Sequence, residues 1–170
     1  IAGAPNAGKS SLINALIKRN AVIVSDIAGI TRDAIDINLD ISGYPIIITD
    51  TAGIHETDNP IEQQGIDIAL EKIEDADVII ALYDASISKS DHSDFLAKYK
   101  EKTIVVANKV DKLSNEEKTL IQNKAILISA KYNEGINILT DTLLDIIKDK
   151  FSNCSDYLIT RTRYKEALNE

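Results

Sequence analysis

The chain contains 170 residues, 44% of them hydrophobic, and carries a net charge of −8 at pH 7. This length suffices for the core of one domain, and no apolar run approaches the length of a membrane span, so no membrane segment is expected. An acidic chain does not attract a phosphate backbone, so direct nucleic-acid binding by this part of the protein is not expected either. The single cysteine, Cys154, cannot form an internal disulfide, which suits a reducing compartment and a cytoplasmic location.

The first pattern along the chain is a phosphate-binding loop. Residues 3–10 contain two glycines separated by four residues and followed by Lys9 and Ser10. In such loops the glycines let successive backbone N–H groups surround the phosphates, the ammonium contacts the outer phosphates and the hydroxyl binds Mg²⁺. The pattern predicts binding of a nucleoside triphosphate, and we assign the phosphate contacts to Asn6, Ala7, Gly8, Lys9, Ser10 and Ser11.

A helix is expected over residues 11–17, followed by a loop and an edge strand. Segment 25–33 lies where a switch loop is expected, and the Thr31 hydroxyl can bind Mg²⁺ when the terminal phosphate is present; the alternative for Thr31 is an ordinary helix cap. Apolar and polar residues alternate over 35–41, which predicts an edge strand with one solvent-facing side that turns at residues 42–43.

A second phosphate-facing motif follows the apolar run at residues 46–49. Asp50 is expected to hold Mg²⁺ through water, and the Gly53 N–H to face the terminal phosphate. Ile54 occupies the position where many switch GTPases carry a glutamine that orients the attacking water, so another residue must do so here. Spacing leaves four candidates, namely His55, Glu56, Asp58 and Glu62.

Two later motifs, each after an apolar run, predict recognition of guanine. Asp111 ends the stretch 108–111, and its carboxylate can accept from both the ring N–H and the exocyclic amine of guanine, a donor pair that adenine lacks. Residues 129–131 can close over the base, with the Ala130 N–H donating to the guanine carbonyl. The residues assigned to the base are therefore Asn108, Lys109, Asp111, Ser129, Ala130 and Lys131.

The order of the elements predicts the fold class. Nearly continuous apolar runs, typical of strands covered on both faces, lie at residues 46–49, 78–83, 104–107 and 125–128. Helical spacing appears at residues 61–73, 91–99, 115–122 and 135–148. This alternation, with one antiparallel hairpin, predicts an α/β protein with a doubly wound, mostly parallel six-stranded sheet and helices on both faces, the Ras-like P-loop GTPase fold. Residues 1–150 are the expected GTPase domain, and residues 151–170 a linker and the start of a helical domain in a longer protein.

These residues resemble the GTPase domain of the tRNA-modification GTPase family MnmE, also called TrmE. The resemblance covers essentially the whole chain and rests on residues 3–12, 26–33, 50–57, 61–66 and 157–168. The phosphate loop and first switch are shared with the ribosome-assembly GTPases Der and Era, so the distinction depends mainly on Glu62 and the tail.

The resemblance implies a cofactor set of GTP or GDP, Mg²⁺ and K⁺. Glu62 would be the catalytic acid, beside Lys9 as the cation of the phosphate loop. Mg²⁺ would be held by Ser10, Thr31 and Asp50, and K⁺ by Asn6 with backbone carbonyls around Ser25, Ile27 and Ile30. The family usually has Thr at positions 25 and 30, and these differences leave the K⁺ site unaffected if its contacts are carbonyls. The family usually has Arg at position 55, so His55 argues against an essential role for the side chain there.

The resemblance also implies partners. Two GTPase domains would pair when GTP and K⁺ are bound, and the full-length protein would modify the tRNA wobble uridine together with a flavoprotein like MnmG. Two alternatives remain at this point: a ribosome-assembly GTPase of the Der or Era type, and a GTP-binding interaction module that does not hydrolyse. The second should lack magnesium-binding hydroxyls or the water-orienting acid, whereas Ser10, Thr31 and Glu62 are present.

Overall fold

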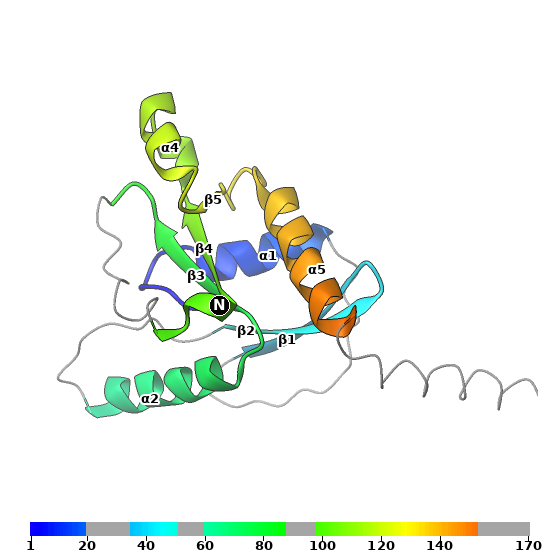
Figure 1. The fold of residues 1–170 in the computed structure, drawn as a ribbon. Coiled ribbons are helices and arrows are strands. Elements are labelled where there is room, and N and C mark those ends of the chain that lie inside the picture. Colours follow the sequence, from blue (N-terminus) through cyan, green and yellow to red (C-terminus); the bar gives the residue numbers. More distant parts are fainter. Residues whose placement is uncertain (20–34, 51–59, 88–97, 153–170) are drawn as a thin grey trace, which may run out of the picture.

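The computed structural model describes residues 1–19, 35–50, 60–87 and 98–152, and Figure 1 shows their arrangement. The elements, in chain order, are the helix α1 (Lys9–Arg19), the strands β1 (Ile35–Ile41) and β2 (Tyr44–Asp50), the helix α2 (Pro60–Asp75), the strand β3 (Ile79–Asp84), the short helix η1 (Lys100–Lys102), the strand β4 (Thr103–Asn108), the short helix η2 (Val110–Lys112), the helix α4 (Asn115–Ile121), the strand β5 (Ile126–Leu127) and the helix α5 (Ile136–Ser152). From β2 onward strands and helices alternate, as in an α/β domain.

The strands form two sheets that the first residues of the chain connect. β1 and β2 are antiparallel, whereas β3, β4 and β5 are parallel and adjacent in that order. Between the sheets, the Ile1 nitrogen donates to the Thr49 carbonyl oxygen at 2.7 Å, and Ala2 forms a parallel bridge with Ala81 of β3. The described residues therefore hold five strands plus this bridge, and the six-stranded sheet expected from the sequence is present only to that extent.

Helices cover both faces of the parallel sheet. Along β3, Ile80 and Leu82 belong to the main core, which also contains residues of α1 and α5, while Ile79 belongs to a smaller core with Ile73 of α2. Neighbouring residues of a strand point to opposite faces, so α1 and α5 lie on one face and α2 on the other. The main core includes the fully buried side chains of Leu12, Leu16, Ile41, Val106, Ile136 and Leu139. A parallel sheet with helices on both faces is the class that the sequence predicts.

The hairpin and the strands at β2, β3 and β4 are confirmed. The expectation that the run at 46–49 is covered on both faces is wrong, because Ile47 is 66% exposed while Ile48 is buried, so β2 has one buried face. The other differences concern boundaries. β5 has two residues where the apolar run 125–128 predicts four, because the Ala125 N–H donates to the Ile121 carbonyl oxygen and the chain turns after Ile128, which keeps one hydrogen bond to Ala107 of β4. α5 continues to Ser152, beyond the expected end at residue 148, so the domain boundary expected at residue 150 falls within its last turn. Most of the helix expected at residues 91–99 and the segment 153–170 lie outside the described residues.

Within the described ranges, none of the helices combines the length and the apolar character needed to cross a bilayer.

Candidate nucleotide-binding site

The predicted site residues gather at the carboxyl ends of the strands. Asp50 is the last residue of β2, Asn108 is the last of β4, and Ser129 follows β5. The phosphate loop comes directly before α1, whose first residue is Lys9. In open α/β sheets, ligands bind outside the carboxyl ends of the strands, so this edge is the expected place for a nucleotide.

The backbone of the phosphate loop requires glycine at positions 3 and 8. Gly8 has a φ of +100°, and a Cβ at this position would lie 2.2 Å from Asn108 Nδ2, so no larger residue fits. A Cβ at Gly3 would lie 2.2 Å from the Leu82 carbonyl oxygen of β3. The loop therefore packs directly on the ends of β3 and β4.

Lys9 reaches back over this loop. Its Nζ donates to the carbonyl oxygens of Gly3 at 3.0 Å and of Ala4 at 3.3 Å. Partial burial lowers the pKa of Lys9, while the nearby Asp50 carboxylate opposes this shift. A phosphate group would give this partly desolvated ammonium a charged acceptor in place of two carbonyls.

Ser10 and Asp50 form a corner suited to a hard cation. Ser10 Oγ donates to Asp50 Oδ2 at 3.4 Å, and Asp50 Oδ1 is buried without a hydrogen-bond partner among the described residues. A buried carboxylate oxygen left unpaired is costly, and a Mg²⁺ ion or one of its water ligands would satisfy it. The residues present thus fit Mg²⁺, with Ser10 and Asp50 as the side chains that would hold it.

The outward carbonyls of the phosphate loop are held by the guanine motif. Asn108 Nδ2 donates to the Ala7 carbonyl oxygen at 2.8 Å, and Lys109 Nζ donates to the Asn6 carbonyl oxygen at 2.8 Å. When N–H groups converge on a phosphate, the carbonyls of the same loop point away from it and need other donors. The two motifs are therefore coupled in space although they lie 101 to 103 residues apart in the sequence.

The base-recognition residues lie beside one another. Ser129 is fully buried, and its Oγ donates to Asp111 Oδ1 at 2.6 Å, which orients a carboxylate that is otherwise exposed. This hydrogen bond lowers the pKa of Asp111, so the group is ionised near neutral pH. The Ala130 N–H, expected at the guanine carbonyl, donates here to Asn108 Oδ1 at 3.1 Å. Lys131 lies on the exposed edge of this group, with its Nζ 4.8 Å from the centre of the Tyr132 ring.

Sequence reasoning missed Asp84, the last residue of β3. Asp84 Oδ2 accepts from Lys109 Nζ at 2.6 Å, and Asp84 Oδ1 accepts from the Ser86 N–H at 3.0 Å and the Ser86 hydroxyl at 2.6 Å. Burial by itself would raise the pKa of Asp84, but the hydrogen bonds from Lys109 and Ser86 outweigh it, and the pKa is lowered. The signal was available, because Asp84 follows the apolar run 78–83 just as Asp50 follows the run 46–49.

Several predicted site residues lie outside the described residues. They are Ser25, Ile27, Ile30, Thr31 and Gly53. Glu62 lies in the first turn of α2, but its side chain is also outside the described part. Their expected roles remain predictions.

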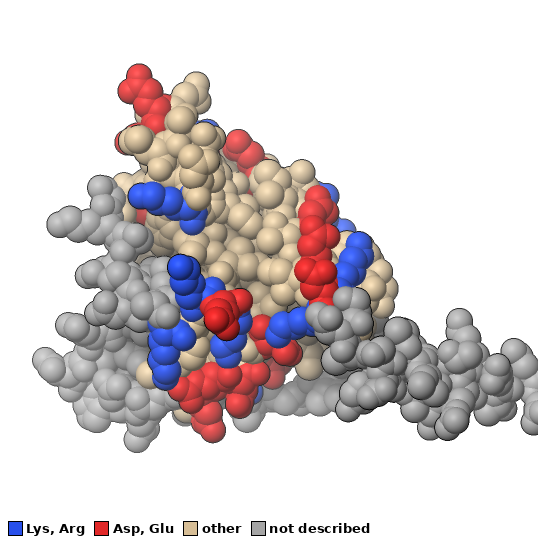
Figure 2. Space-filling view, in the orientation of Figure 1, with Lys and Arg blue, Asp and Glu red and all other residues tan. Residues whose placement is uncertain are grey.

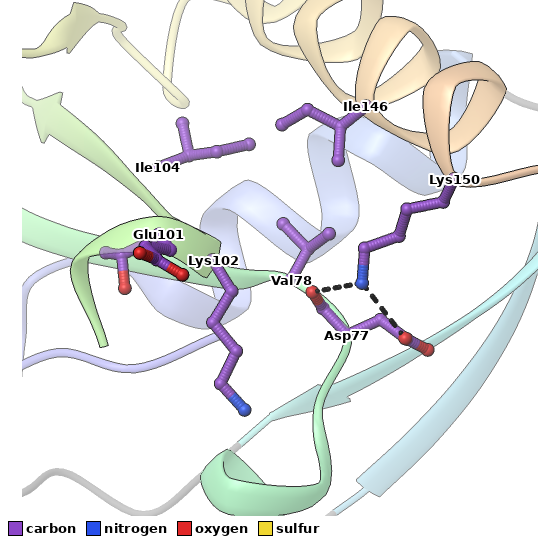
Figure 3. Close-up of a pocket in the computed structure, with 8 residues that line it drawn as sticks. Asp77, Val78, Glu101, Lys102, Ile104, Ile146 and Lys150 are labelled. Carbon is purple, nitrogen blue, oxygen red and sulfur yellow. Dashed lines mark hydrogen bonds and ion pairs between the residues drawn. The ribbon is translucent and has the colours of Figure 1, made fainter. Parts of the chain in front are cut away.

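A cavity of about 100 Å³ lies at the other edge of the sheet, where β3 and β4 begin (Figure 3). Val78, Ile104 and Ile146 give it an apolar wall. Lys150 Nζ donates to the Asp77 carbonyl oxygen at 2.9 Å and to Asp77 Oδ1 at 3.1 Å, which ties α5 to the start of β3. Lys102 Nζ donates to the backbone carbonyls of Ile73, Glu74 and Ala76, and the cavity is remote from the predicted nucleotide site.

Basic and acidic side chains are intermixed on the face shown in Figure 2. Two of the pairs on the described surface are Lys98 with Glu74, at 2.8 Å, and Lys150 with Asp77, at 3.1 Å.

Comparison with known proteins gives consistent results. A family model described as 50S ribosome-binding GTPase matches residues 1–109. Among curated proteins, the chain is 37% identical over 171 residues to the tRNA modification GTPase MnmE of Paramagnetospirillum magneticum, with 100% of this chain and 39% of that protein covered. It is 40% identical over 178 residues to MnmE of Clostridioides difficile, with the same coverage. The chain thus spans about two fifths of the length of these relatives.

Solved structures show the same fold. Era in complex with MgGDPNP and nucleotides of 16S ribosomal RNA has a TM-score of 0.68 and 28% identity, covering 85% of this chain and 54% of that one. The cytosolic domain of FeoB from L. pneumophila has a TM-score of 0.63 and 27% identity, covering 85% of this chain and 61% of that one.

Proposed function

The chain belongs to the 50S ribosome-binding GTPase family and is a GTP-hydrolysing enzyme similar to the GTPase domain of MnmE, and on that premise we propose that K⁺ stimulates its hydrolysis of GTP as part of a tRNA-modifying protein. The observation that carries this proposal is the match to MnmE proteins along 100% of the chain. The full-length protein would act in the cytoplasm on tRNA, with a flavoprotein like MnmG as partner.

The site residues have complementary roles in this proposal. Lys9 and the N–H groups of residues 6–11 bind the phosphates, Ser10, Thr31 and Asp50 hold Mg²⁺, and Gly53 faces the terminal phosphate. Asn108, Lys109, Asp111, Ser129, Ala130 and Lys131 surround the guanine. Mg²⁺ would neutralise charge on the phosphate oxygens, and the protein would supply position and further positive charge.

K⁺ is proposed because hydrolysis needs one more cation. Charge develops between the β and γ phosphates as the bond breaks, and Lys9 is the only cationic side chain in the phosphate loop. Asn6 has a φ of 62° and an exposed side chain, and Lys109 holds its carbonyl, which leaves its side-chain oxygen for an ion. The carbonyls of Ser25, Ile27 and Ile30 would complete the cage.

Glu62 is proposed to orient the attacking water. The side chain of Ile54 cannot hydrogen-bond to the water, so the acid must come from elsewhere. Glu62, at the start of α2, would act through a second, bridging water, and only when the intervening loop closes. Catalysis would then depend on that closure.

The test compares GTP turnover in K⁺ and Na⁺ at equal ionic strength. We expect turnover about tenfold or more faster in K⁺, because a preorganised cation at the developing charge stabilises the transition state. Asn6→Ala should remove this difference and leave GTP affinity nearly unchanged. Ser42→Ala is the matched control, since Ser42 is also exposed and has a φ of 55° but lies in the β1–β2 turn, and it should behave as the unmodified chain does. Equal rates in the two salts for the unmodified chain would refute the K⁺ proposal.

The similarity to Era makes a ribosome-assembly GTPase of the Der or Era type the second candidate. Pairing of the chain distinguishes the two. With a non-hydrolysable GTP analogue, sedimentation should give a dimer in K⁺ and a monomer in Na⁺ if the MnmE-type proposal holds. A monomer in both salts would favour the second candidate.

A further inference from the structure

Asp84 occupies a fully bonded position at the edge of the predicted site. One carboxylate oxygen accepts from two groups of Ser86, and the other accepts from Lys109 Nζ at 2.6 Å. The Asp84 side chain is 10% exposed and the Lys109 side chain 28% exposed, so this ion pair is largely shielded from solvent. Because both oxygens are held, the carboxylate presents a fixed acceptor to Lys109.

Lys109 in turn joins two parts of the site. Its backbone has a φ of 64°, an uncommon conformation for a residue with a side chain. Its ammonium bonds both Asp84 Oδ2 and the carbonyl oxygen of Asn6 in the phosphate loop. A lysine side chain is flexible, and fixing it costs conformational entropy. The ion pair with Asp84 offsets this entropy cost, so Lys109 is already ordered before a nucleotide binds.

We propose that Asp84 is a positioning residue for guanine-nucleotide binding, which acts by holding Lys109 against the phosphate loop. This proposal rests on the proposed function, in which Lys109 contacts the guanine base. With Asp84 ionised, the aliphatic part of the Lys109 side chain is held in one position against the base. Asn6 then retains the backbone conformation that directs the N–H groups of the loop toward the phosphates. Without the Asp84 carboxylate, nucleotide binding must also order the Lys109 side chain, so the complex is weaker.

The experiment measures release and affinity of fluorescently labelled GDP from the chain. Asp84→Asn keeps the size of the side chain but removes the charge, and we expect about tenfold or more weaker GDP binding, mainly through faster release. In GTP hydrolysis the KM should rise while kcat changes little, since Asp84 contacts no phosphate. Asp77→Asn is the matched control: Asp77 also pairs with a lysine and precedes the same strand, but at the remote edge, and GDP binding should be unchanged.

A double-variant comparison separates positioning from a general structural role. If Asp84 acts only through Lys109, then Lys109→Met and the double variant Lys109→Met with Asp84→Asn should bind GDP equally within about twofold. This comparison remains decisive if Asp84→Asn alone does not fold, because the double variant carries no unpaired charge at the site. A further tenfold or greater loss in the double variant would overturn the proposal.

The outcomes also distinguish this proposal from the function on which it rests. Normal GDP binding by both the unmodified chain and Asp84→Asn would overturn the role of Asp84 alone. If the unmodified chain bound no GDP, the nucleotide site itself would be wrong, and with it the role of Asp84.

Discussion

At the residue scale, the candidate site depends on a few residues with left-handed backbone. Asn6, Gly8 and Lys109 have φ values of 62°, 100° and 64°. Glycine and asparagine tolerate this region, whereas lysine does so less readily, and in each case the conformation directs a backbone or side-chain group into the site. Hydrogen bonds from Asn108 and Lys109 to the loop carbonyls help hold these conformations. The predicted base and phosphate motifs are thus coupled through individual atoms.

Asp111 gives the prediction at this scale. Ser129 Oγ donates to Asp111 Oδ1, and because an ionised carboxylate has acceptor sites on both oxygens, acceptor capacity remains for the two guanine donors. Asp111→Asn would place an amide donor there, and we expect GTP affinity to fall by about 10²-fold or more while affinity for xanthosine triphosphate, which offers a carbonyl, increases. Competition between the two nucleotides for the chain measures this. Tight GTP binding with no gain for the xanthine nucleotide would contradict the assignment of residues 108–111.

At the element scale, the link between β5 and α5 has little freedom. β5 contributes two residues, and the chain then turns through residues 129–134 before α5 begins at Ile136. Gly135 lies at this junction with a φ of 71°, and a Cβ there would lie 2.1 Å from the Leu127 carbonyl oxygen. The base-recognition residues 129–131 lie in the same turn. The close approach of Gly135 to β5 therefore also positions part of the candidate site.

Gly135→Ala tests this junction against a matched glycine. We expect it to lower the free energy of unfolding by about 2 kcal/mol or more, because backbone atoms block the added carbon, and to weaken GDP binding as well. Gly43, in the β1–β2 turn, has a φ of 88° with nothing within 4 Å of an added Cβ. Gly43→Ala should therefore cost only the conformational strain, about 1 kcal/mol. Chemical denaturation of both variants checks the order, and equal costs would contradict the steric account.

At the scale of the whole molecule, one core holds elements from most of the chain. Leu12 and Leu16 of α1, Ile41 of β1, Leu82 of β3 and Leu139 of α5 share it. Unfolding therefore releases the ion pairs and hydrogen bonds at the strand ends together with the core. Charged groups in the candidate site contribute to the stability of the entire domain.

Acid unfolding follows from those charges. Asp84, held by Lys109 and Ser86 against the effect of burial, and Asp111, held by Ser129, both have lowered pKa values. Carboxylates of this kind add stability above the pKa of the unfolded chain, about 4, and the contribution is lost as pH falls through the lower folded pKa. The free energy of unfolding should thus decrease from about pH 6 to about pH 3, and decrease less in Asp84→Asn. Denaturant titrations at several pH values measure this, and an identical decrease in the variant would contradict it.

Much of the fold and of the candidate site could be predicted from the sequence because both depend on local patterns. The runs at β3 and β4 are apolar over most of their length and are largely buried, as expected, and the motif residues Asp50 and Asn108 are the last residues of their strands. The run at β2 was misleading, because only Ile48 is buried and Ile47 is 66% exposed. Prediction was poorer for β5, where an apolar run of four residues forms a strand of two, because the Ala125 N–H donates to the Ile121 carbonyl oxygen in competition with the ladder, and the chain turns after Ile128. That competition is not visible in the run itself.

The sequence by itself determined the class of the fold, the order of its elements and the residue types at the nucleotide site, because periodicity and short motifs act within a few residues of the chain. Only the tertiary structure decided which of these groups bond one another. The pairing of Lys109 with Asp84, the contact of Asn108 with the phosphate loop and the orientation of Asp111 by Ser129 join residues 18 to 101 positions apart. Such contacts depend on where parallel strands end side by side in space, and spacing along the chain does not contain that information.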